Sequence, residues 1–448
     1  MQHPEKSSAL RLPATSRRAW LAGMSGAGIA LAAGAASPPA HAARVATKAH
    51  IVIAGSGLAG LALAHRLTKM LDGAKVTVID AKEEHNYQPG YTLVATGVWP
   101  VGKVIDQNAD FMPAGVEWVK DMVAEFDPAA NAVVTASGQR IAYDYLVVAV
   151  GTHQDWAQIE GMDVQAIGQN GLTSVYPSSG AAVATWAAMD AFRKKGGKAV
   201  MTLPSTALKC AGAPLKMAFM LRDRLAQSGT LDQSEVMFYS ALGNVFSVKT
   251  VNDNVLERWK DLGIGLETHQ ALKSIDIGAR RATFANPEGV ATEVAYDFIH
   301  VTPPMRAPDA VKNSDLAWKE GPMAASGWLE VDKATLQHRR YPNVFGLGDI
   351  NGTPRGKTAA TVKKSAPIVA QHVVDLIAGR PLDGHFDGYT SCPMIVREGS
   401  TMLIEFDYDG NLTPSLPMIE PLQESYFAWL MKVWMLKPAY MATLKGRV

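Results

Sequence analysis

Short runs of apolar residues alternate with helix-forming stretches along most of this chain. The first run, at residues 50–54, is followed by helix-forming residues at 61–67 and then by a second run at 75–79. Apolar runs of this length fit strands that are buried on both faces, as in a parallel sheet. Strands that alternate with helices in this way predict an α/β fold.

Three glycines occupy the turn between the first strand and the helix, in the sequence Gly55-Ser56-Gly57-Leu58-Ala59-Gly60. Such glycines permit a tight turn and a close approach of the backbone to a pyrophosphate, whose charge the helix N-terminus favours. Asp80 ends the second strand, where an acid accepts a hydrogen bond from a ribose hydroxyl. We therefore predict a dinucleotide site at Gly55, Gly57, Leu58, Gly60 and Asp80. The alternative, a glycine-rich turn without a ligand, leaves the acid unexplained.

A later strand, predicted at 198–203, lacks a comparable loop. The sequence after it runs from Pro204 to Pro214 without phosphate-binding glycines, and proline has no backbone N–H to donate. We expect a second Rossmann-like domain that has lost its nicotinamide site. Electrons would then come from a source other than NAD(P)H, which argues against a type II NADH dehydrogenase.

Composition and charge narrow the class of protein. With 448 residues, 48% of them hydrophobic, the chain can form two or three domains with buried cores. The formal charge is +1 and the basic residues are dispersed, so we predict no nucleic-acid partner. The two cysteines, Cys210 and Cys392, are too few for a disulfide scaffold. We predict no metal site.

The N-terminus carries the features of a removable signal peptide. Arg17-Arg18 precede an apolar segment rich in alanine and glycine, and Ala40-His41-Ala42 supplies a small-residue cleavage site. Paired arginines resemble the twin-arginine signal, which exports proteins that have already folded around a cofactor. A transmembrane anchor is the alternative, but the apolar run is short. We expect a periplasmic protein on the outer face of the inner membrane.

Two strands that close on glycine resemble those of two-domain flavoproteins of the disulfide-reductase type. They are predicted at 143–152 and 341–349. The resemblance implies that the first fingerprint binds FAD, with Asp349 at the ribityl or phosphate part and the backbone of Val123 at the adenine. It also implies that a helix opening near Lys357 and Thr358 faces the flavin's pyrimidine edge, where the helix dipole and Lys357 would stabilise the reduced ring. A plain surface lysine is the alternative reading of Lys357.

The surroundings of both cysteines resemble the sulfide:quinone oxidoreductases. The similar stretches are 208–214 around Cys210, 301–308, 389–393 around Cys392, and 86–91, which includes Gln88 among the predicted cofactor residues. The resemblance implies that Cys210 and Cys392 form a redox pair that reacts with sulfide and passes electrons to FAD. Relatives with covalent FAD use a third cysteine, so the FAD here is expected to be non-covalent. A purely structural disulfide is the alternative.

The C-terminal tail is predicted to dock on a membrane. Residues 424–440 are rich in aromatic residues and methionine, and the positive charge comes from Lys432, Lys437, Lys445 and Arg447. This composition suits an amphipathic helix in the bilayer interface, with its basic side toward anionic lipid and access to membrane quinone. An ordinary core helix is the alternative. Pro438 is expected to end the helix near residue 437.

These expectations divide the chain into a signal peptide (1–42), an FAD domain in two parts (46–155 and 301–385), a second Rossmann-like domain (156–300) and a C-terminal cysteine and membrane segment (386–448). Two other functions stay open. One is the flavoprotein subunit of a flavocytochrome c sulfide dehydrogenase, which passes electrons to a cytochrome c. The other is a redox-inert FAD-fold protein that serves in binding or assembly.

Overall fold

The glycine fingerprint folds into a parallel sheet with a helix on one face. The structure is a computed structural model and describes residues 44–448, so the predicted signal peptide lies outside the described residues. Strand β2 (His50–Ala54) leads into α2 (Leu58–Met70), and β4 (Lys75–Ile79) returns beside β2. Five parallel strands form this sheet, in the order β22 (Val344–Gly346), β11 (Tyr145–Val148), β2, β4 and β7 (Glu117–Val119).

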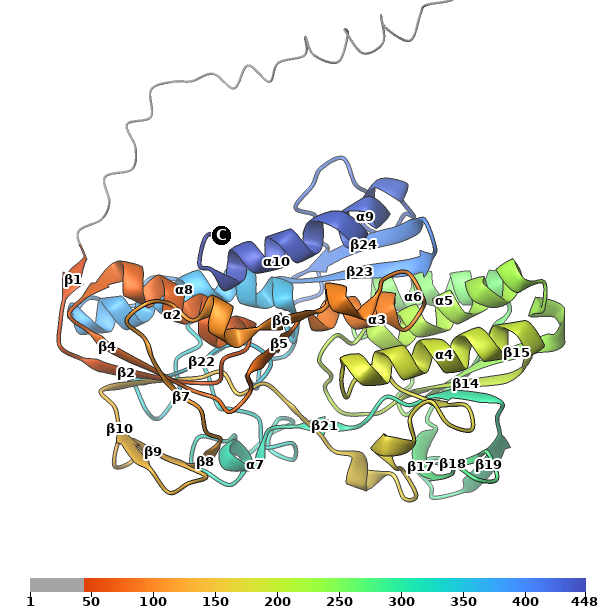
Figure 1. The fold of residues 1–448 in the computed structure, drawn as a ribbon, viewed down its shortest axis with the longest axis horizontal. Coiled ribbons are helices and arrows are strands. Elements are labelled where there is room, and N and C mark those ends of the chain that lie inside the picture. The colour runs from red at the N-terminus through yellow and green to blue at the C-terminus, as the bar shows by residue number, and fades with distance from the viewer. Residues whose placement is uncertain (1–43) are drawn as a thin grey trace, which may run out of the picture. The chain divides into compact units, whose positions relative to one another are not determined.

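A second parallel sheet follows in the middle of the chain, at the right of Figure 1. Its strand order is β13 (Leu172–Thr173), β20 (Phe298–His300), β14 (Gly197–Leu203), β15 (Ser234–Ser240) and β16 (Ile264–Glu267). The long helices of this part are α4 (Ser179–Lys195), α5 (Ala213–Ser228) and α6 (Lys249–Leu262). Strand β22 returns to the first sheet about 200 residues after β11, so the first sheet is built from two separate segments.

Smaller antiparallel sheets and short helices complete the two halves. One three-stranded sheet contains β8 (Val123–Asp127), β9 (Ala132–Thr135) and β10 (Arg140–Ala142), and another contains β17 (Ala271–Asp276), β18 (Arg281–Ala285) and β19 (Ala291–Ala295). One short pair, β1 (Val45–Ala46) with β3 (Leu71–Asp72), is parallel. Two others are antiparallel: β5 (Glu84–Asn86) with β6 (Ile105–Gln107), and β12 (His153–Gln154) with β21 (Met305–Arg306). The short helices include α3 (Tyr91–Val94) and α7 (Asp309–Lys312).

The C-terminal part lies over both halves. After α8 (Ala359–Ile377), the hairpin of β23 (Thr390–Arg397) and β24 (Ser400–Phe406) lies above α5. Helix α9 (Tyr426–Leu430) packs on β24, and α10 (Leu436–Leu444) packs against α2 and α8 (Figure 1). The end of the chain is held on α2, where the Nζ of Lys69 donates to the carbonyls of Lys445 and Gly446. The tail is therefore part of the folded body.

Our prediction that Pro438 ends the C-terminal helix is wrong. A π-helical turn, η7 (Met431–Met435), separates α9 from α10, and α10 continues to Leu444. Pro438 has no N–H to donate and lies directly after the π-helical turn, where the regular α-helical hydrogen-bond pattern is already interrupted. Among residues 44–448, no helix combines the length and the apolar character that crossing a membrane requires.

Candidate active site

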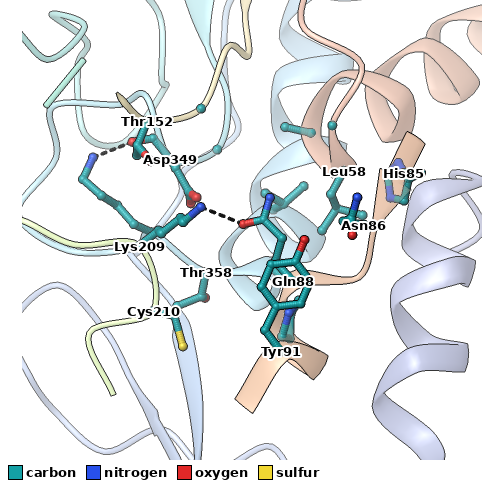
Figure 2. Close-up of a pocket in the computed structure, with 18 of the residues that line it drawn as sticks. Leu58, His85, Asn86, Gln88, Tyr91, Thr152, Lys209, Cys210, Asp349 and Thr358 are labelled. Carbon is teal, nitrogen blue, oxygen red and sulfur yellow. Dashed lines mark hydrogen bonds between the residues drawn. The ribbon is translucent and has the colours of Figure 1, made fainter. Parts of the chain in front are cut away.

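A cleft of about 410 Å³ opens at the carboxyl edge of the first sheet. Eight of the predicted residues line it: Gly57, Leu58, Asp80, Gln88, Cys210, Asp349, Lys357 and Thr358. Segments far apart in the sequence meet there, and Figure 2 shows the side chain of Lys209 pointing toward Gln88. The Nζ of Lys209 donates to the side-chain oxygen of Gln88 over 2.9 Å.

The three fingerprint glycines have different roles in this cleft. A side chain on Gly55 would collide with the carbonyl of Ala149, and one on Gly60 with the carbonyl of Gly55. A side chain on Gly57 would meet no protein atom within 4 Å and would project into open space. Gly55 and Gly60 therefore serve close packing of strand and helix, while Gly57 keeps free the space into which a ligand's phosphate fits.

The cleft fits FAD by the chemistry of its wall. Asn86, Thr152 and Gln154 each present a buried side-chain oxygen that has no hydrogen-bond partner among residues 44–448. Buried polar groups are normally hydrogen-bonded, so these atoms indicate a polar ligand. Helix α8 also begins at the cleft, with Thr358 as its N-cap, which favours negative charge there. These features match the hydroxyls, carbonyls and phosphates of a flavin dinucleotide.

A second cavity, about 620 Å³ in volume, lies against the cleft and contains both cysteines. We call it the cysteine cavity. Apolar side chains form most of its wall; they include Leu203, Phe246, Leu403, Phe406, Met431 and Met435. Six residues line both spaces: Pro89, Cys210, Lys357, Thr358, Ala359 and Tyr440. The two cavities therefore meet at Cys210, whereas Cys392 lines the cysteine cavity alone.

The backbone around the cysteines is arranged for close approach. Cys210 has a left-handed backbone (φ 51°), which is uncommon for a residue other than glycine, and its N–H donates to the carbonyl of Lys357 over 3.0 Å. A side chain on Gly212, just before α5, would collide with the sulfur of Cys392. The absence of a side chain at Gly212 therefore lets Cys392 pack beside the start of the helix that follows Cys210. Both cysteines are free thiols.

Lys216 lies between the two sulfur atoms. Its Nζ is 3.6 Å from the sulfur of Cys210, and its side chain is almost fully buried on α5. Burial acts to lower the pKa of Lys216, but the two neighbouring sulfurs outweigh it, so the pKa is raised and the ammonium form is kept. Burial raises the pKa of the Cys392 thiol, while the Lys216 charge opposes that rise. Lys216 therefore stabilises thiolate at this pair.

A second buried lysine reaches the cavity from the C-terminal tail. The Nζ of Lys432, in the π-helical turn, donates to the carbonyl of Pro89 over 2.7 Å. Burial and the Lys216 charge lower its pKa to about 7. Lys437 is 2.9 Å from Asp106. Our expectation that the basic residues of the tail face lipid is therefore wrong for Lys432 and Lys437.

Sequence reasoning missed both cavity lysines, although a signal exists for each. Lys216 is the one charged residue in the apolar run 213–221, and Lys432 stands within an aromatic and methionine-rich stretch. A lone charge in a buried segment requires a partner. Lys216 has Cys210, nearby in sequence, and the distant Cys392, while Lys432 has the carbonyl of Pro89. Lys209 is beside Cys210 in the sequence, but its Nζ is hydrogen-bonded to Gln88.

Two other predicted residues differ in their position, because Lys357 lines the cleft and Val123 does not. Lys357 is buried rather than a surface lysine, and its Nζ donates to the carbonyls of Asp349 and Asn351 and lies 3.6 Å from the ring centre of Trp328. Burial lowers the pKa of Lys357 to about 7. Val123, at the start of β8, lines neither cavity. Its contact with adenine stays a prediction.

Comparison with known proteins agrees with this geometry. Residues 49–366 match the family model described as pyridine nucleotide-disulphide oxidoreductase. The mitochondrial sulfide:quinone oxidoreductase of Dictyostelium discoideum is 37% identical over 89% of this chain and 86% of its own. The chain belongs to the sulfide:quinone oxidoreductase family. As a member of this family it is an oxidoreductase that binds FAD, and the predicted resemblance is confirmed.

Solved structures support the predicted fold class, α/β with two Rossmann-like domains of the disulfide-reductase flavoprotein type. The sulfide:quinone oxidoreductase of Aquifex aeolicus covers 89% of this chain and 92% of its own, with a TM-score of 0.71 at 20% identity. A chain in the structure of the Tetrahymena thermophila mitochondrial ATP synthase covers 91% of this chain and 98% of its own length, with a TM-score of 0.78 at 20% identity. These likenesses show the fold alone, so membership of the sulfide:quinone oxidoreductase family rests on the sequence relatives.

Proposed function

We propose that this protein oxidises sulfide at the Cys210–Cys392 pair and passes the electrons through FAD to a membrane quinone. The observation that carries the proposal is the position of Cys210, where the FAD cleft meets an apolar cavity that also holds Cys392 and Lys216. One site thus contains two thiols, a cation that stabilises thiolate, and access to a redox cofactor.

The cysteines carry the sulfur chemistry. With the pair oxidised to a disulfide, hydrosulfide attacks one sulfur, the S–S bond breaks, and a new S–S bond forms a persulfide on that cysteine. The other cysteine leaves as a thiolate, which retains the electron pair of the broken bond. Cys210 is suited to be this thiolate because it lines both cavities, and Cys392, which lines the cysteine cavity alone, is suited to carry the persulfide. Lys216 stabilises the negative charge at either sulfur.

Bound FAD supplies a two-electron acceptor for the thiolate and a donor for the next substrate. The residues that would hold it are Gly57, Asp80, Gln88, Asp349 and Thr358, on elements of both halves of the first domain. Tyr176 is buried in the FAD cleft, where its hydroxyl donates to the carbonyl of Cys210 over 3.5 Å. Burial raises its pKa, so it stays neutral. The chain thus contributes binding, orientation and electrostatics.

The apolar cavity and the outer face of the tail support quinone as the electron acceptor. Met435 lines the cysteine cavity and is 54% exposed at the surface, so the cavity extends to the C-terminal helices. Tyr426, Phe427 and Trp434 are exposed on the same helices. Aromatic side chains exposed in this way are typical of a membrane-interface surface, from which a lipid-soluble quinone could enter.

The location we propose is the outer face of the inner membrane, reached through a twin-arginine signal in the first 42 residues. A sulfide-oxidising flavoprotein that is exported after folding can bind FAD beforehand. The flavocytochrome alternative shares such an export signal but requires a soluble cytochrome partner. The apolar lining of the cysteine cavity favours quinone over that partner.

Anaerobic addition of sulfide to the purified holoprotein tests the sulfur half of the proposal. We expect the flavin absorbance to bleach in the wild type and to bleach slower by several orders of magnitude in Cys210→Ser and Cys392→Ser, both of which keep FAD. The thiols act as a unit, so the double variant should be little slower than either single one. A wild-type spectrum that sulfide leaves unchanged would instead indicate a redox-inert protein.

A further inference from the structure

The hairpin that carries Cys392 is not part of a larger sheet. Strands β23 and β24 form a sheet of only two strands, and Cys392 lies near the start of β23. Two-stranded hairpins are marginally stable in water without packing against other elements. Here β23 lies along α5, the helix that begins just after Cys210 and carries Lys216. The position of Cys392 relative to Cys210 thus depends on how β23 is seated on α5.

The two elements run side by side over matching lengths. Gly212 lies against Cys392 at one end, and Arg224 pairs with Glu398 at the other. The twelve steps from residue 212 to residue 224 rise about 18 Å in a helix, and the six steps from 392 to 398 extend about 20 Å in a strand. A contact at the Arg224 end therefore fixes the register at the sulfur end, where a slip of one strand residue moves the thiol by about 3.3 Å.

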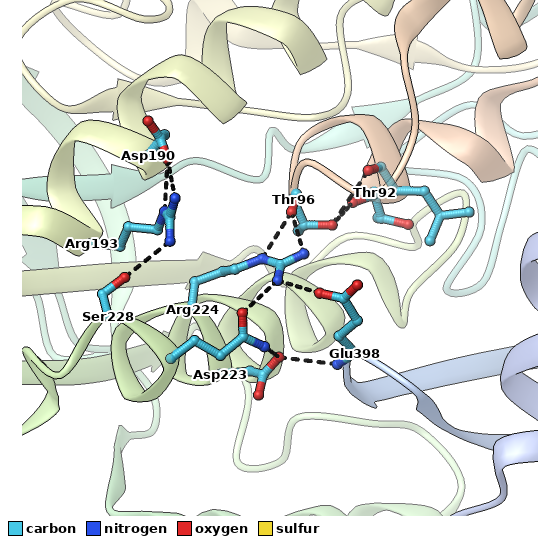
Figure 3. Close-up of polar contacts among 10 residues, drawn as sticks. Thr92, Thr96, Asp190, Arg193, Asp223, Arg224, Ser228 and Glu398 are labelled. Carbon is cyan, nitrogen blue, oxygen red and sulfur yellow. Dashed lines mark hydrogen bonds and ion pairs between the residues drawn. The ribbon is translucent and has the colours of Figure 1, made fainter.

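Asp223 and Arg224, two consecutive residues of α5, bind the turn of the hairpin (Figure 3). A carboxylate oxygen of Asp223 accepts from the backbone N–H of Glu398 over 3.0 Å, and the guanidinium of Arg224 donates to the Glu398 carboxylate. The Arg224 side chain is 8% exposed, whereas the Glu398 side chain is 48% exposed. We call this set of contacts the Arg224 clasp.

The same guanidinium reaches a third element. Its Nε and Nη2 both donate to the carbonyl of Thr96, over 3.0 and 2.8 Å. Thr96 follows α3, and the residues just before α3 include Tyr87 and Pro89, which line the cysteine cavity. One buried arginine therefore links the helix of Lys216, the hairpin of Cys392 and the segment at the junction of the two cavities.

We propose that Arg224 is a positioning residue, which acts through Glu398 and Thr96 to set the spacing of Cys210 and Cys392. This inference rests on the proposed redox role of the pair. Glu424 separately anchors the hairpin by accepting from Ser400 and pairing with Arg258 of α6. Loss of the clasp should therefore shift β23 on α5 without unfolding the hairpin.

The test measures how readily the two thiols of the FAD-loaded protein form a disulfide. The holoprotein is equilibrated anaerobically with mixtures of reduced and oxidised dithiothreitol, whose disulfide accepts two electrons and two protons from the pair. Free thiols are then alkylated and counted by intact mass. Glu398→Ala is the main variant, because its side chain is half exposed and tolerates truncation, and Arg224→Gln is the second variant.

We expect the equilibrium constant for disulfide formation to fall about tenfold in Glu398→Ala, which corresponds to a potential about 30 mV less negative. Flavin reduction by sulfide should slow by a similar factor, while FAD content and the unfolding temperature stay near those of the wild type. Arg193→Gln is the matched control. Arg193 binds Asp190 of α4 and Ser228 of α5 but does not touch the hairpin (Figure 3).

The proposed role of Arg224 would be overturned if both Glu398→Ala and Arg224→Gln kept the wild-type equilibrium constant for disulfide formation. It would also be overturned if the control Arg193→Gln lowered that constant as much as they do. If Arg224→Gln fails to fold, Glu398→Ala decides the matter alone. Failure of the proposed function gives a different result, because sulfide would then leave the flavin spectrum of the wild-type protein unchanged, whether or not its two thiols form a disulfide.

Discussion

The reactive centre consists of two thiols and two buried lysines that line the cysteine cavity: Cys210, Cys392, Lys216 and Lys432. Lys216 lies within 3.6 Å of the Cys210 sulfur, and Lys432 adds a second amine whose pKa is lowered to about 7 by burial. An opposite charge at this range favours the ionised form of a thiol. The centre thus offsets the cost of burying a thiolate in an apolar cavity.

Replacement of Lys216 by methionine should make thiolate harder to form. Burial already raises the pKa of Cys392, and loss of the Lys216 charge removes a group that lowers it, so the pKa should rise further. In a Cys210→Ser background, we expect the pH midpoint of Cys392 alkylation to move up by about one pH unit or more. The same background with Lys216 intact is the control, and an unchanged midpoint would show that Lys216 does not act on Cys392.

Gly212→Ala tests how closely Cys392 packs against the start of α5. Alanine suits the backbone there (φ −82°), but its methyl group would collide with the Cys392 sulfur. We expect flavin reduction by sulfide to slow at least tenfold while the FAD content is unchanged. Gly180→Ala, in the first turn of α4, has room for a methyl group and should behave as the wild type. A fully active Gly212→Ala enzyme would contradict the observed packing.

At this scale the sequence predicted the groups whose signal is local. The fingerprint glycines and Asp80 could be read because strand, turn and helix follow one another within 31 residues, 50–80. Both cysteines were found through their surroundings. Lys216 and Lys432 were missed because their burial, and the approach of Cys392 to Lys216 and of Pro89 to Lys432, depend on contacts between segments more than 100 residues apart. The sequence also could not show that the three fingerprint glycines have different roles, with Gly57 at the ligand site and Gly55 and Gly60 in close packing.

Among the elements, the C-terminal helices combine two roles that the sequence presented as alternatives. Lys432 and Tyr440 point inward and line the cysteine cavity, whereas Tyr426, Phe427 and Trp434 are exposed. Composition could predict an amphipathic segment, but it could not show which basic residues turn inward. The π-helical turn decides this, because it adds a residue to one turn and shifts the faces of the helix after it.

The exposed aromatic residues allow a test of membrane docking that leaves the cavity intact. A variant with Tyr426, Phe427 and Trp434 all changed to alanine should bind anionic vesicles at least tenfold less well, since burying one such side chain contributes about 1.5–3 kcal/mol. Flavin reduction by sulfide should be unaffected. Met122→Ala, which removes an apolar side chain that is 54% exposed before β8, is the control. Equal vesicle binding by the triple variant and the wild type would exclude this surface.

For the molecule as a whole, two sheets and a tail enclose one continuous site. The first sheet supplies the FAD cleft, the second sheet leads into Cys210, and the tail closes the cysteine cavity. The apolar runs and the glycine motif predicted strands that alternate with helices and a second Rossmann-like domain, but not the order of the strands in either sheet. The hairpin of Cys392 and the C-terminal tail cover the junction of the two cavities. This arrangement depends on packing between segments that are distant in sequence, so no local sequence pattern predicts it.

The mode of FAD attachment follows from the whole chain's cysteine content. Cys210 and Cys392 are the two cysteines of the sequence, and both are assigned to the redox pair. We therefore expect yellow protein whose FAD is released into the supernatant by acid precipitation, as measured by its absorbance. Flavin that stays with the precipitated polypeptide would show a covalent link and would remove one cysteine from the proposed pair.

The central claim is tested most directly by anaerobic turnover of the wild-type holoprotein with sulfide and either a short-chain ubiquinone or cytochrome c. The apolar cavity beside both cysteines predicts rapid quinone reduction that Cys392→Ser abolishes, and slow or no reduction of cytochrome c. Cytochrome c reduction that is faster than quinone reduction would contradict the account and assign the protein to the flavocytochrome type.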